Sequence, residues 1–370
     1  MNRALSLAFV LVISLPLAAN LAGVDGGDSH AENRELAAMP ALDGSVTSVL
    51  RFPAGFSSWF EDHFGFRSML VRWYGETRLF GLGVSPTTAV VNGRGGWLFY
   101  ADDAGMDDYS NVTPLAPGWR MAWKDTIVRA SEWLRARGIA YVFTIAPDKH
   151  VLYPDEMPAS IRRVRDESRT DEVFGVLGGT GAPAVDVRAR LRDARERERI
   201  FQKTDTHWND RGAFVAYEQI IAVVRAQCPA VPAAWSRDDF TATEVVEEAG
   251  DLAGMMGLRR VLREVDLRLT PVRPRLARVV DPPGAQASDE LGQVITEIPG
   301  STLPRAVIFR DSFASALAPF LSEHFSRAVY LWQNDFDASV VEKEHADVVI
   351  QEIVGRHLYE FVPSPELVPK

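Results

Sequence analysis

Three apolar runs, A-V-I-F (306–309), A-V-Y-L-W (328–332) and D-V-V-I-Q-E-I (347–353), decide the fold class of this chain. The segments that connect these runs have helical patterns. An earlier run, I-A-Y-V-F-T-I-A (139–146), follows an amphipathic helix predicted over 119–137. Continuous apolar strands that alternate with helices are typical of a parallel sheet covered on both faces. The sequence therefore predicts an α/β fold with a mostly parallel sheet.

The rest of the chain divides into segments of different character. We expect a signal anchor or signal peptide over 1–25, a tether over 26–50, a lead-in packed on the core over 51–117, and the main domain over 118–365 with an insertion at 227–300. The first segment has one charge at Arg3 and none before Asp25, which is about the length needed to cross a bilayer. No clean A-x-A cleavage site follows, which favours an uncleaved hydrophobic helix and, in either case, export of the body.

Composition excludes several classes of function. A formal net charge of −10 over 370 residues does not suggest a surface that binds nucleic acid. No CxxC or HExxH spacing is present, so we expect no metal site, and without a phosphate-binding loop we expect no cofactor. The single cysteine, Cys228, rules out an intramolecular disulfide.

Ligands of open parallel sheets bind beyond the carboxyl ends of the strands, so the residues that follow each run are the candidates for a site. These are P-D-K-H (147–150), T-D-T-H-W (204–208), R-D-S-F (310–313) and Q-N-D-F-D (333–337).

Ser312 follows one of these strands at the turn into the next helix. The commonest role of Asp311 or Ser312 at such a place is to cap the helix N-terminus. The alternative is a nucleophile elbow, in which the hydroxyl projects above the sheet edge and free helix N–H groups face the position of an oxyanion.

Asp205 and His207 lie two residues apart before a predicted helix. In an extended segment they face the same way, roughly 6.5 to 7 Å apart at Cα, so the carboxylate reaches one ring nitrogen and leaves the other as a base. Asn209 or Asp210 is expected to cap the helix, whose N-terminus disfavours the imidazolium and keeps the base neutral. A buried histidine bonded to its neighbour and a metal ligand are the alternatives. With Ser312, the pair supplies a nucleophile, a base and an orienting carboxylate.

Five motifs in one order carry a family resemblance. They are F-E-D-H-F-G-F-R (60–67), V-V-N-G-R-G-G-W-L-F-Y (90–100), I-A-P-D-K-H-V-L-Y-P (145–154), T-D-T-H-W-N-D-R-G-A (204–213) and I-F-R-D-S-F (308–313). From about Phe52 onward the chain resembles the SGNH-hydrolase-like polysaccharide O-acetyltransferases of the AlgJ/AlgX type. The resemblance implies an SGNH-like, flavodoxin-like catalytic domain with Ser312 as nucleophile, His207 as base and Asp205 as its partner.

The chain departs from the family pattern at two places, and several further residues are candidates for the expected site. Arg310 stands where ordinary SGNH esterases have glycine, and Asn334 is a candidate oxyanion donor because no separate Gly and Asn blocks are evident. Lys149 and Tyr153 are expected to bind a hexose or its carboxylate, unless they are a solvated lysine and a packed tyrosine. Trp208 is expected to wall the site and to stack on a sugar.

The resemblance implies a periplasmic O-acetyltransferase tethered to the inner membrane by its N-terminal segment. It would act on an alginate-like polysaccharide through an acetyl-serine, with acetyl groups supplied by a membrane-bound O-acyltransferase partner. Two alternatives stay open: a carbohydrate acetyl esterase with the same triad, and a non-catalytic scaffold for polysaccharide assembly.

Overall fold

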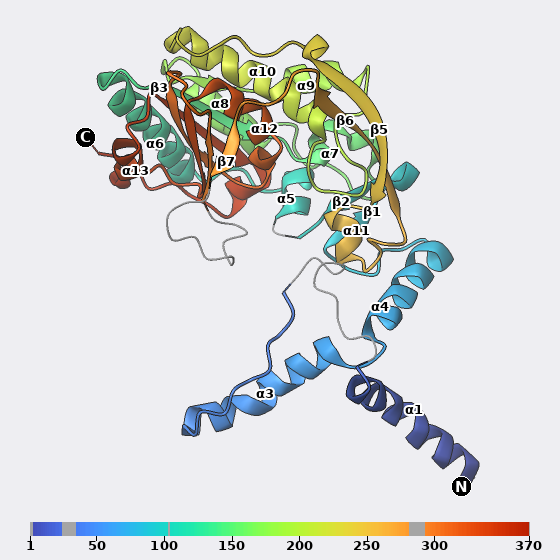
Figure 1. Cartoon of the computed structure of the whole chain (residues 1–370). Coiled ribbons are helices and arrows are strands. Elements are labelled where there is room, and N and C mark those ends of the chain that lie inside the picture. The colour runs from blue at the N-terminus through green and yellow to red at the C-terminus, as the bar shows by residue number, and fades with distance from the viewer. Residues whose placement is uncertain (1–2, 24–34, 103, 281–292, 370) are drawn as a thin grey trace.

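A seven-stranded sheet forms the centre of the protein (Figure 1). The computed structural model describes residues 3–23, 35–102, 104–280 and 293–369. In spatial order the strands are β4 (Ala184–Val185), β3 (Ala140–Ala146), β11 (Val348–Val354), β9 (Arg305–Arg310), β10 (Arg327–Trp332), β8 (Val294–Glu297) and β7 (Arg278–Val280). The first five strands are parallel, and β8 and β7 are antiparallel to their neighbours. The predicted mostly parallel sheet is confirmed.

Helices cover both faces of the sheet, as predicted. On one face lie α9 (Arg188–Arg195), α10 (Asp210–Gln227) and α12 (Ala318–Leu321), and on the other α6 (Pro117–Ala136), α8 (Arg169–Leu177) and α13 (Ala338–Lys343). Within β3, Val142 packs with the first group whereas Tyr141 and Phe143 pack with the second. Because successive side chains of a strand point to opposite faces, a sheet buried on both sides requires strands without polar alternation.

A short hairpin precedes the sheet domain. Strand β1 (Val90–Asn92) pairs antiparallel with β2 (Leu98–Tyr100) around a glycine-rich turn, as the sequence predicts. The Leu98 N–H donates to the carbonyl of Lys203 at 2.9 Å, so the hairpin lies against the segment that carries T-D-T-H. The helices α5 (Gly105–Ser110) and α7 (Lys149–Leu152) follow the hairpin and β3 respectively.

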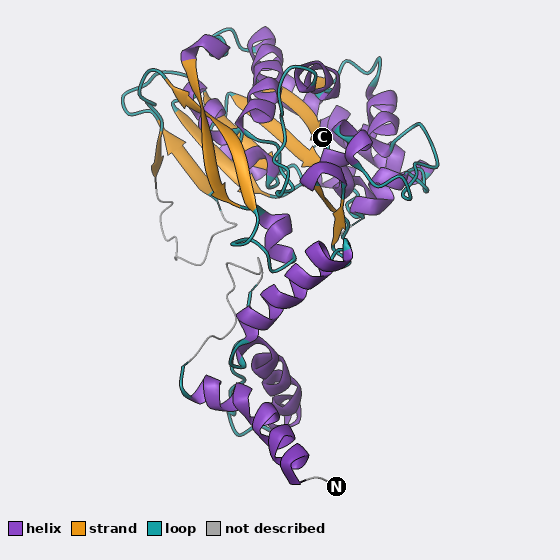
Figure 2. Cartoon of the chain, turned by 90° about the vertical axis from the view of Figure 1, so that its right-hand side faces the viewer, coloured by secondary structure: helices purple, strands orange, loops and turns teal. Residues whose placement is uncertain are grey.

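The N-terminal helices project away from the sheet domain (Figures 1 and 2). They are α1 (Arg3–Leu21), α3 (Val46–His63) and α4 (Arg67–Glu76), and the last continues into a π-helical turn, Thr77–Gly81. Within α1, an 18-residue stretch of mean hydropathy 1.7 is long and apolar enough to cross a membrane. Helix α3 begins inside the segment expected to be a tether, and the Gly65 N–H donates to Pro16 O at 3.1 Å to join the first two helices.

The stretch 227–300, which is predicted only as an insertion, contains regular structure. Strands β5 (Phe240–Glu248) and β6 (Arg263–Pro271) form an antiparallel hairpin, and α11 (Asp251–Met255) lies between them in the chain. Strands β7 and β8 of this stretch extend the main sheet. The 3₁₀ turns of the chain are Arg94–Gly96, Pro154–Glu156, Arg237–Asp239, Phe313–Ser315, Ser322–His324, Gly355–Tyr359 and Pro365–Leu367.

The core position of Phe309 in β9 gives a stability prediction. Its side chain is fully buried and its ring centroid lies 5.7 Å from that of Phe336. We expect Phe309→Ala to lower the free energy of unfolding by about 3–5 kcal/mol, because the substitution leaves a cavity. Phe80, which is 62% exposed, supplies the control: Phe80→Ala should change stability by roughly 0.5 kcal/mol or less in the same denaturant titration. Equal effects of the two substitutions would contradict the assigned core.

Candidate active site

Asp205 and His207 lie in a tight loop between Phe201 and Trp208, which form an isolated antiparallel bridge. The loop is bent, not extended as the sequence analysis assumed, yet it brings the two side chains together. Asp205 Oδ1 accepts a hydrogen bond from His207 Nδ1 at 2.7 Å and from the His207 backbone N–H at 3.0 Å. One carboxylate oxygen therefore fixes both the position and the tautomer of the histidine.

Lys149, the first residue of α7, holds this loop in place. Its Nζ donates hydrogen bonds of 3.0, 3.0 and 2.6 Å to the carbonyl oxygens of Gln202, Lys203 and Asp205. The residue is 4% exposed, so the alternative of a solvated lysine is wrong, and all three ammonium hydrogens have acceptors without a sugar. Burial lowers the pKa of Lys149 to about 7 although the Asp205 carboxylate opposes this shift.

Helix α11 brings a second carboxylate to the loop. Asp251 Oδ1 accepts from the Thr206 N–H at 2.7 Å, and the Asp251 N–H donates to Asp205 Oδ2 at 3.0 Å. Asp251 Oδ2 lies 3.9 Å from His207 Nδ1. A Cβ on the preceding Gly250 would lie 2.3 Å from Asp205 Cβ, so only glycine permits this approach. Sequence reasoning missed Asp251 because its segment had no assigned structure.

The electrostatic environment raises the pKa of His207. Burial alone lowers this pKa, and Arg356 acts in the same direction, but the hydrogen bond and charge of Asp205 and the charge of Asp251 outweigh both. Asn209 does cap α10, accepting from two N–H groups at 3.1 and 3.2 Å. The expected lowering of the pKa of His207 by this helix N-terminus does not prevail, because Asp205 and Asp251 raise that pKa.

Ser312 begins the turn that follows β9. Asp311 Oδ1 accepts from the Phe313 N–H at 2.9 Å and Asp311 Oδ2 from the Val354 N–H at 2.6 Å, so Asp311 is the capping residue. Ser312 itself makes no side-chain cap. Neither its hydroxyl nor its N–H makes a hydrogen bond to another residue in the described part of the chain. Both groups are therefore available to a ligand.

Phe313 connects the two motifs across the sheet edge. Its carbonyl accepts from Trp208 Nε1 at 3.0 Å over a sequence separation of 105 residues, and its ring lies 4.9 Å from the His207 ring. His207 Nε2 is buried and has no hydrogen-bond partner among the described residues, and no hydrogen bond joins it to Ser312. A buried ring nitrogen without a partner, packed against the residue that follows a serine with a free hydroxyl, is the feature of this edge that calls for a ligand or a reaction.

Tyr153 and Trp208 serve as packing groups at this edge. The hydroxyl of Tyr153 accepts from the Ile200 N–H at 3.1 Å, and its ring lies 4.2 Å from that of Trp97. Trp208 is 2% exposed and packs edge-on against Phe313 at 5.3 Å, so it supports the site from within and offers no open face for stacking on a sugar.

Arg310 is buried beside the nucleophile position. Its Nη1 donates to the Asp311 carbonyl at 3.2 Å and to Ser315 Oγ at 3.1 Å, and its guanidinium lies 4.4 Å from the ring centroid of Trp332. The Asn334 side chain makes no hydrogen bond to the described residues and stays a candidate donor.

Two clusters have three ligand-type atoms within 4.8 Å of one another in the described ranges: Asp108, Asp148 and His150, and Asp205, His207 and Asp251. In the first, Arg356 Nη1 bonds Asp148 at 2.6 Å and His150 Nε2 bonds Asp108 at 2.7 Å. His150 is buried in α7. In the second, three of the four carboxylate oxygens accept hydrogen bonds from N–H groups. Both arrangements fit hydrogen-bonded networks better than ion sites.

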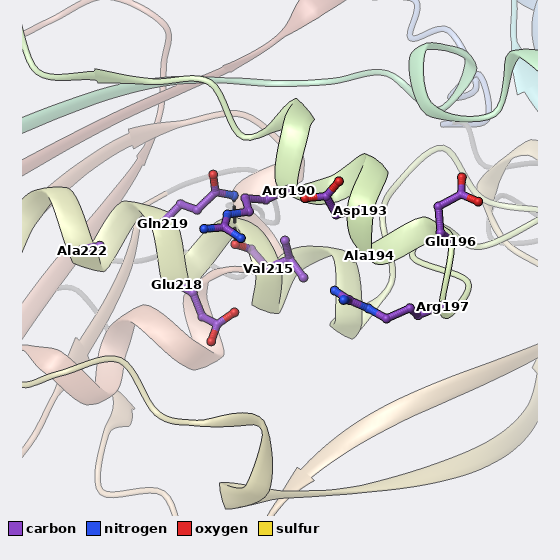
Figure 3. Close-up of a pocket in the computed structure, with 9 residues that line it drawn as sticks. All are labelled: Arg190, Asp193, Ala194, Glu196, Arg197, Val215, Glu218, Gln219 and Ala222. Atoms are coloured by element: carbon purple, nitrogen blue, oxygen red, sulfur yellow. Dashed lines mark hydrogen bonds between the residues drawn. The ribbon is translucent and has the colours of Figure 1, made fainter.

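Two grooves differ in their relation to this edge. A groove of about 770 Å³ lies between α9 and α10, where side chains of both charges face solvent and none of the predicted catalytic residues is present (Figure 3). A second groove of about 510 Å³ adjoins the T-D-T-H loop through Lys203 and Thr204 and is also lined by Gly95, Gly96 and Arg263.

The parallel sheet, with an Asp–His pair and a serine at its carboxyl edge, defines an α/β domain of the SGNH-hydrolase-like class. Residues 90–333 match the family described as "SGNH hydrolase-like domain, acetyltransferase AlgX". The chain belongs to this family, and the resemblance stated from the motifs is confirmed.

Related sequences and one solved structure agree with this assignment. Probable alginate O-acetylase AlgJ of Pseudomonas aeruginosa is 28% identical over 141 residues, which are 37% of this chain and 33% of that protein. AlgJ of Azotobacter vinelandii is 25% identical over 239 residues, 61% of this chain and 54% of that protein. The matches thus span a third to a half of these relatives. The structure of Bacillus cereus PatB1 with a sulfonyl adduct, 15% identical, superposes with a TM-score of 0.52 over 73% of this chain and 97% of that chain, and shares the fold.

The role of Lys149 as a loop support gives a testable prediction. Lys149→Met retains a long side chain but leaves the carbonyl oxygens of Gln202 and Asp205 without a donor, whereas that of Lys203 keeps the Leu98 N–H, and each unsatisfied group costs about 1–3 kcal/mol. We expect a loss of roughly 2–5 kcal/mol in the free energy of unfolding. Lys343→Met, on the exposed surface of α13, is the control and should be close to wild type. If Lys149→Met unfolds like the control, the ammonium does not hold the loop.

Proposed function

We propose that this protein is a polysaccharide O-acetyltransferase that forms an acetyl-Ser312 intermediate, with His207 as general base and Asp205 as its partner. The observations that carry the proposal are the buried, unpartnered Nε2 of His207 and a serine whose hydroxyl and N–H are both free, with the ring of the next residue, Phe313, 4.9 Å from the His207 ring. Membership of the acetyltransferase AlgX family supports the reaction class.

In the first half-reaction Ser312 Oγ attacks the carbonyl carbon of an acetyl donor. His207 Nε2 accepts the hydroxyl proton and then passes it to the leaving oxygen of the donor. The Asp205 carboxylate, bonded to Nδ1 at 2.7 Å, stabilises the imidazolium that forms in between. The free Ser312 N–H is placed to donate to the carbonyl oxygen as negative charge develops there, and the Asn334 side chain is a further candidate donor.

In the second half-reaction a sugar hydroxyl attacks the acetyl-serine. His207 removes the proton of that hydroxyl and returns a proton to Ser312 Oγ, so that the enzyme is regenerated and the sugar carries the acetyl ester. No step requires a cofactor. Since Lys149, Tyr153 and Trp208 are occupied with packing, they act on substrate only through the loop they support.

We place the polysaccharide acceptor in the groove beside Thr204. Glu264 in its wall pairs with Arg199 at 2.7 Å, which leaves Lys203 and Arg263 as cations without an acidic partner among the described residues. Such a lining suits an acidic, alginate-like chain, in agreement with the names of the AlgJ relatives. The apolar helix α1 would tether the enzyme to the inner membrane in the periplasm, where a membrane-bound O-acyltransferase would supply acetyl groups.

An esterase differs from this transferase only in its acceptor. If water enters in place of the sugar hydroxyl, the same intermediate releases acetate. A non-catalytic scaffold would retain the groove without turnover.

The proposed roles predict a large loss of activity on substitution. Ser312→Ala and His207→Gln are each expected to lower kcat/KM for acetyl transfer from an activated ester by a factor of about 10⁶, the order of the loss when a triad serine or histidine is removed. The assay measures acetylated oligouronate and free acetate separately, and Ser339→Ala, a surface serine on α13, is the control. Full activity of Ser312→Ala would exclude the acetyl-serine; acetate as the sole product would favour the esterase.

The raised pKa of His207 predicts the pH profile. His207 must be neutral to accept a proton, so kcat/KM should increase with pH through the pKa of this residue. Since that pKa is raised above its ordinary value of 6.5, the acid limb should have its midpoint above pH 6.5. A midpoint at or below this value would contradict the electrostatic account of the site.

A further inference from the structure

We propose that Asp251 is a positioning residue that acts on His207 as a second carboxylate, beyond the expected Ser312–His207–Asp205 triad. This inference rests on the proposed function. It assigns a role in the site to α11. This helix lies in the stretch 227–300, for which no site residue is predicted from the sequence.

The geometry holds the Asp251 carboxylate at a fixed place. Its Oδ1 is bound by the Thr206 N–H at 2.7 Å while its backbone N–H binds Asp205 Oδ2 at 3.0 Å, so α11 and the loop clamp each other in both directions. A third bond of 3.0 Å runs from the Gly250 N–H to Thr204 Oγ1. The remaining oxygen, Asp251 Oδ2, has no N–H donor in the described structure and lies 3.9 Å from His207 Nδ1.

This distance makes the interaction electrostatic. Nδ1 donates its hydrogen to Asp205 Oδ1 at 2.7 Å, so Asp251 contributes charge without a hydrogen bond to the ring. When Ser312 gives its proton to His207, the imidazolium faces two carboxylates. An opposite charge within about 4–6 Å raises the pKa of a histidine by about one unit or more.

Other charged groups near the loop reduce the increase in the pKa of His207 but do not cancel it. Arg356 opposes protonation of His207, and the Lys149 ammonium interacts with Asp205 and Asp251. Glu264 and Arg199 act on Lys149 with opposite signs, and they pair with each other at 2.7 Å. The charges that act on the His207 ring are therefore those of Asp205 and Asp251, which both lie on the Nδ1 side, against that of Arg356.

The test uses Asp251→Asn in the full chain. Asparagine keeps an oxygen that accepts from the Thr206 N–H and removes only the negative charge. The readout is the rate at which phenylmethylsulfonyl fluoride sulfonylates Ser312 as a function of pH, followed by mass spectrometry. In this reaction Oγ bonds to sulfur, fluoride leaves and His207 takes the proton, so the midpoint reports the pKa of His207 without any acetyl donor.

We expect Asp251→Asn to move this midpoint down by about one pH unit. Asp238→Asn, the same charge change on the exposed surface of the same stretch, should leave the midpoint unchanged. Equal midpoints for Asp251→Asn and wild type would overturn the proposal while leaving the triad intact.

An NMR titration of His207 separates this inference from the proposed function. Its signal, assigned by comparison with His207→Gln, gives the pKa without use of Ser312. A lower pKa in Asp251→Asn supports the role of Asp251 even if wild-type Ser312 is not sulfonylated, a result that would count against the acetyl-serine alone. An unchanged pKa in this titration refutes the role of Asp251 whatever Ser312 does.

Discussion

The buried ammonium of Lys149 is the interaction on which the rest of the site depends. It lies directly after β3, so its position is set by the central sheet, and its three hydrogen bonds fix the backbone of the loop that carries Asp205. Among the described residues, the Lys149 ammonium is the only donor to the carbonyl oxygens of Gln202 and Asp205. Without a donor in the centre, these buried carbonyls would each cost free energy.

From this support the other contacts follow in sequence. The fixed loop lets Asp205 orient His207, and α11 binds the loop through the Asp251 N–H. Trp208 of the loop donates a hydrogen bond to the carbonyl of Phe313, the residue after Ser312. Contacts from Lys149, Asp251 and Phe313 thus hold the loop that carries the proposed catalytic pair. Such positioning is what catalysis requires. Burial lowers the pKa of His207, but the Asp205 and Asp251 carboxylates raise it by more.

Much of the fold and part of the site could be predicted from the sequence. Continuous apolar strands specified the parallel sheet, and the end of the strand over 306–309 marked the place of Ser312. Asp205 and His207 lie in a loop that follows no strand of the sheet, so that their position at this edge could not be predicted from a strand end. The roles of Lys149 and Trp208 could not be predicted, since nothing local distinguishes a lysine at a solvated loop from one whose acceptors lie more than fifty residues away. The role of Asp251 could not be predicted for the same reason, because it arises from contact between segments separated by 46 residues. The full increase in the pKa of His207 could not be predicted, because the charge of Asp251 comes from a segment 46 residues from Asp205.

The most direct test of the account is whether the acetyl group passes through Ser312 to a sugar. The full chain would be mixed with an activated acetyl ester, quenched in acid and examined by peptide mass spectrometry before and after addition of an oligouronate. The account predicts one acetyl group on the peptide that contains Ser312, and its transfer to the sugar when the acceptor is added. Acetylated sugar that forms without any acetyl-Ser312, or in the Ser312→Ala variant, would contradict it.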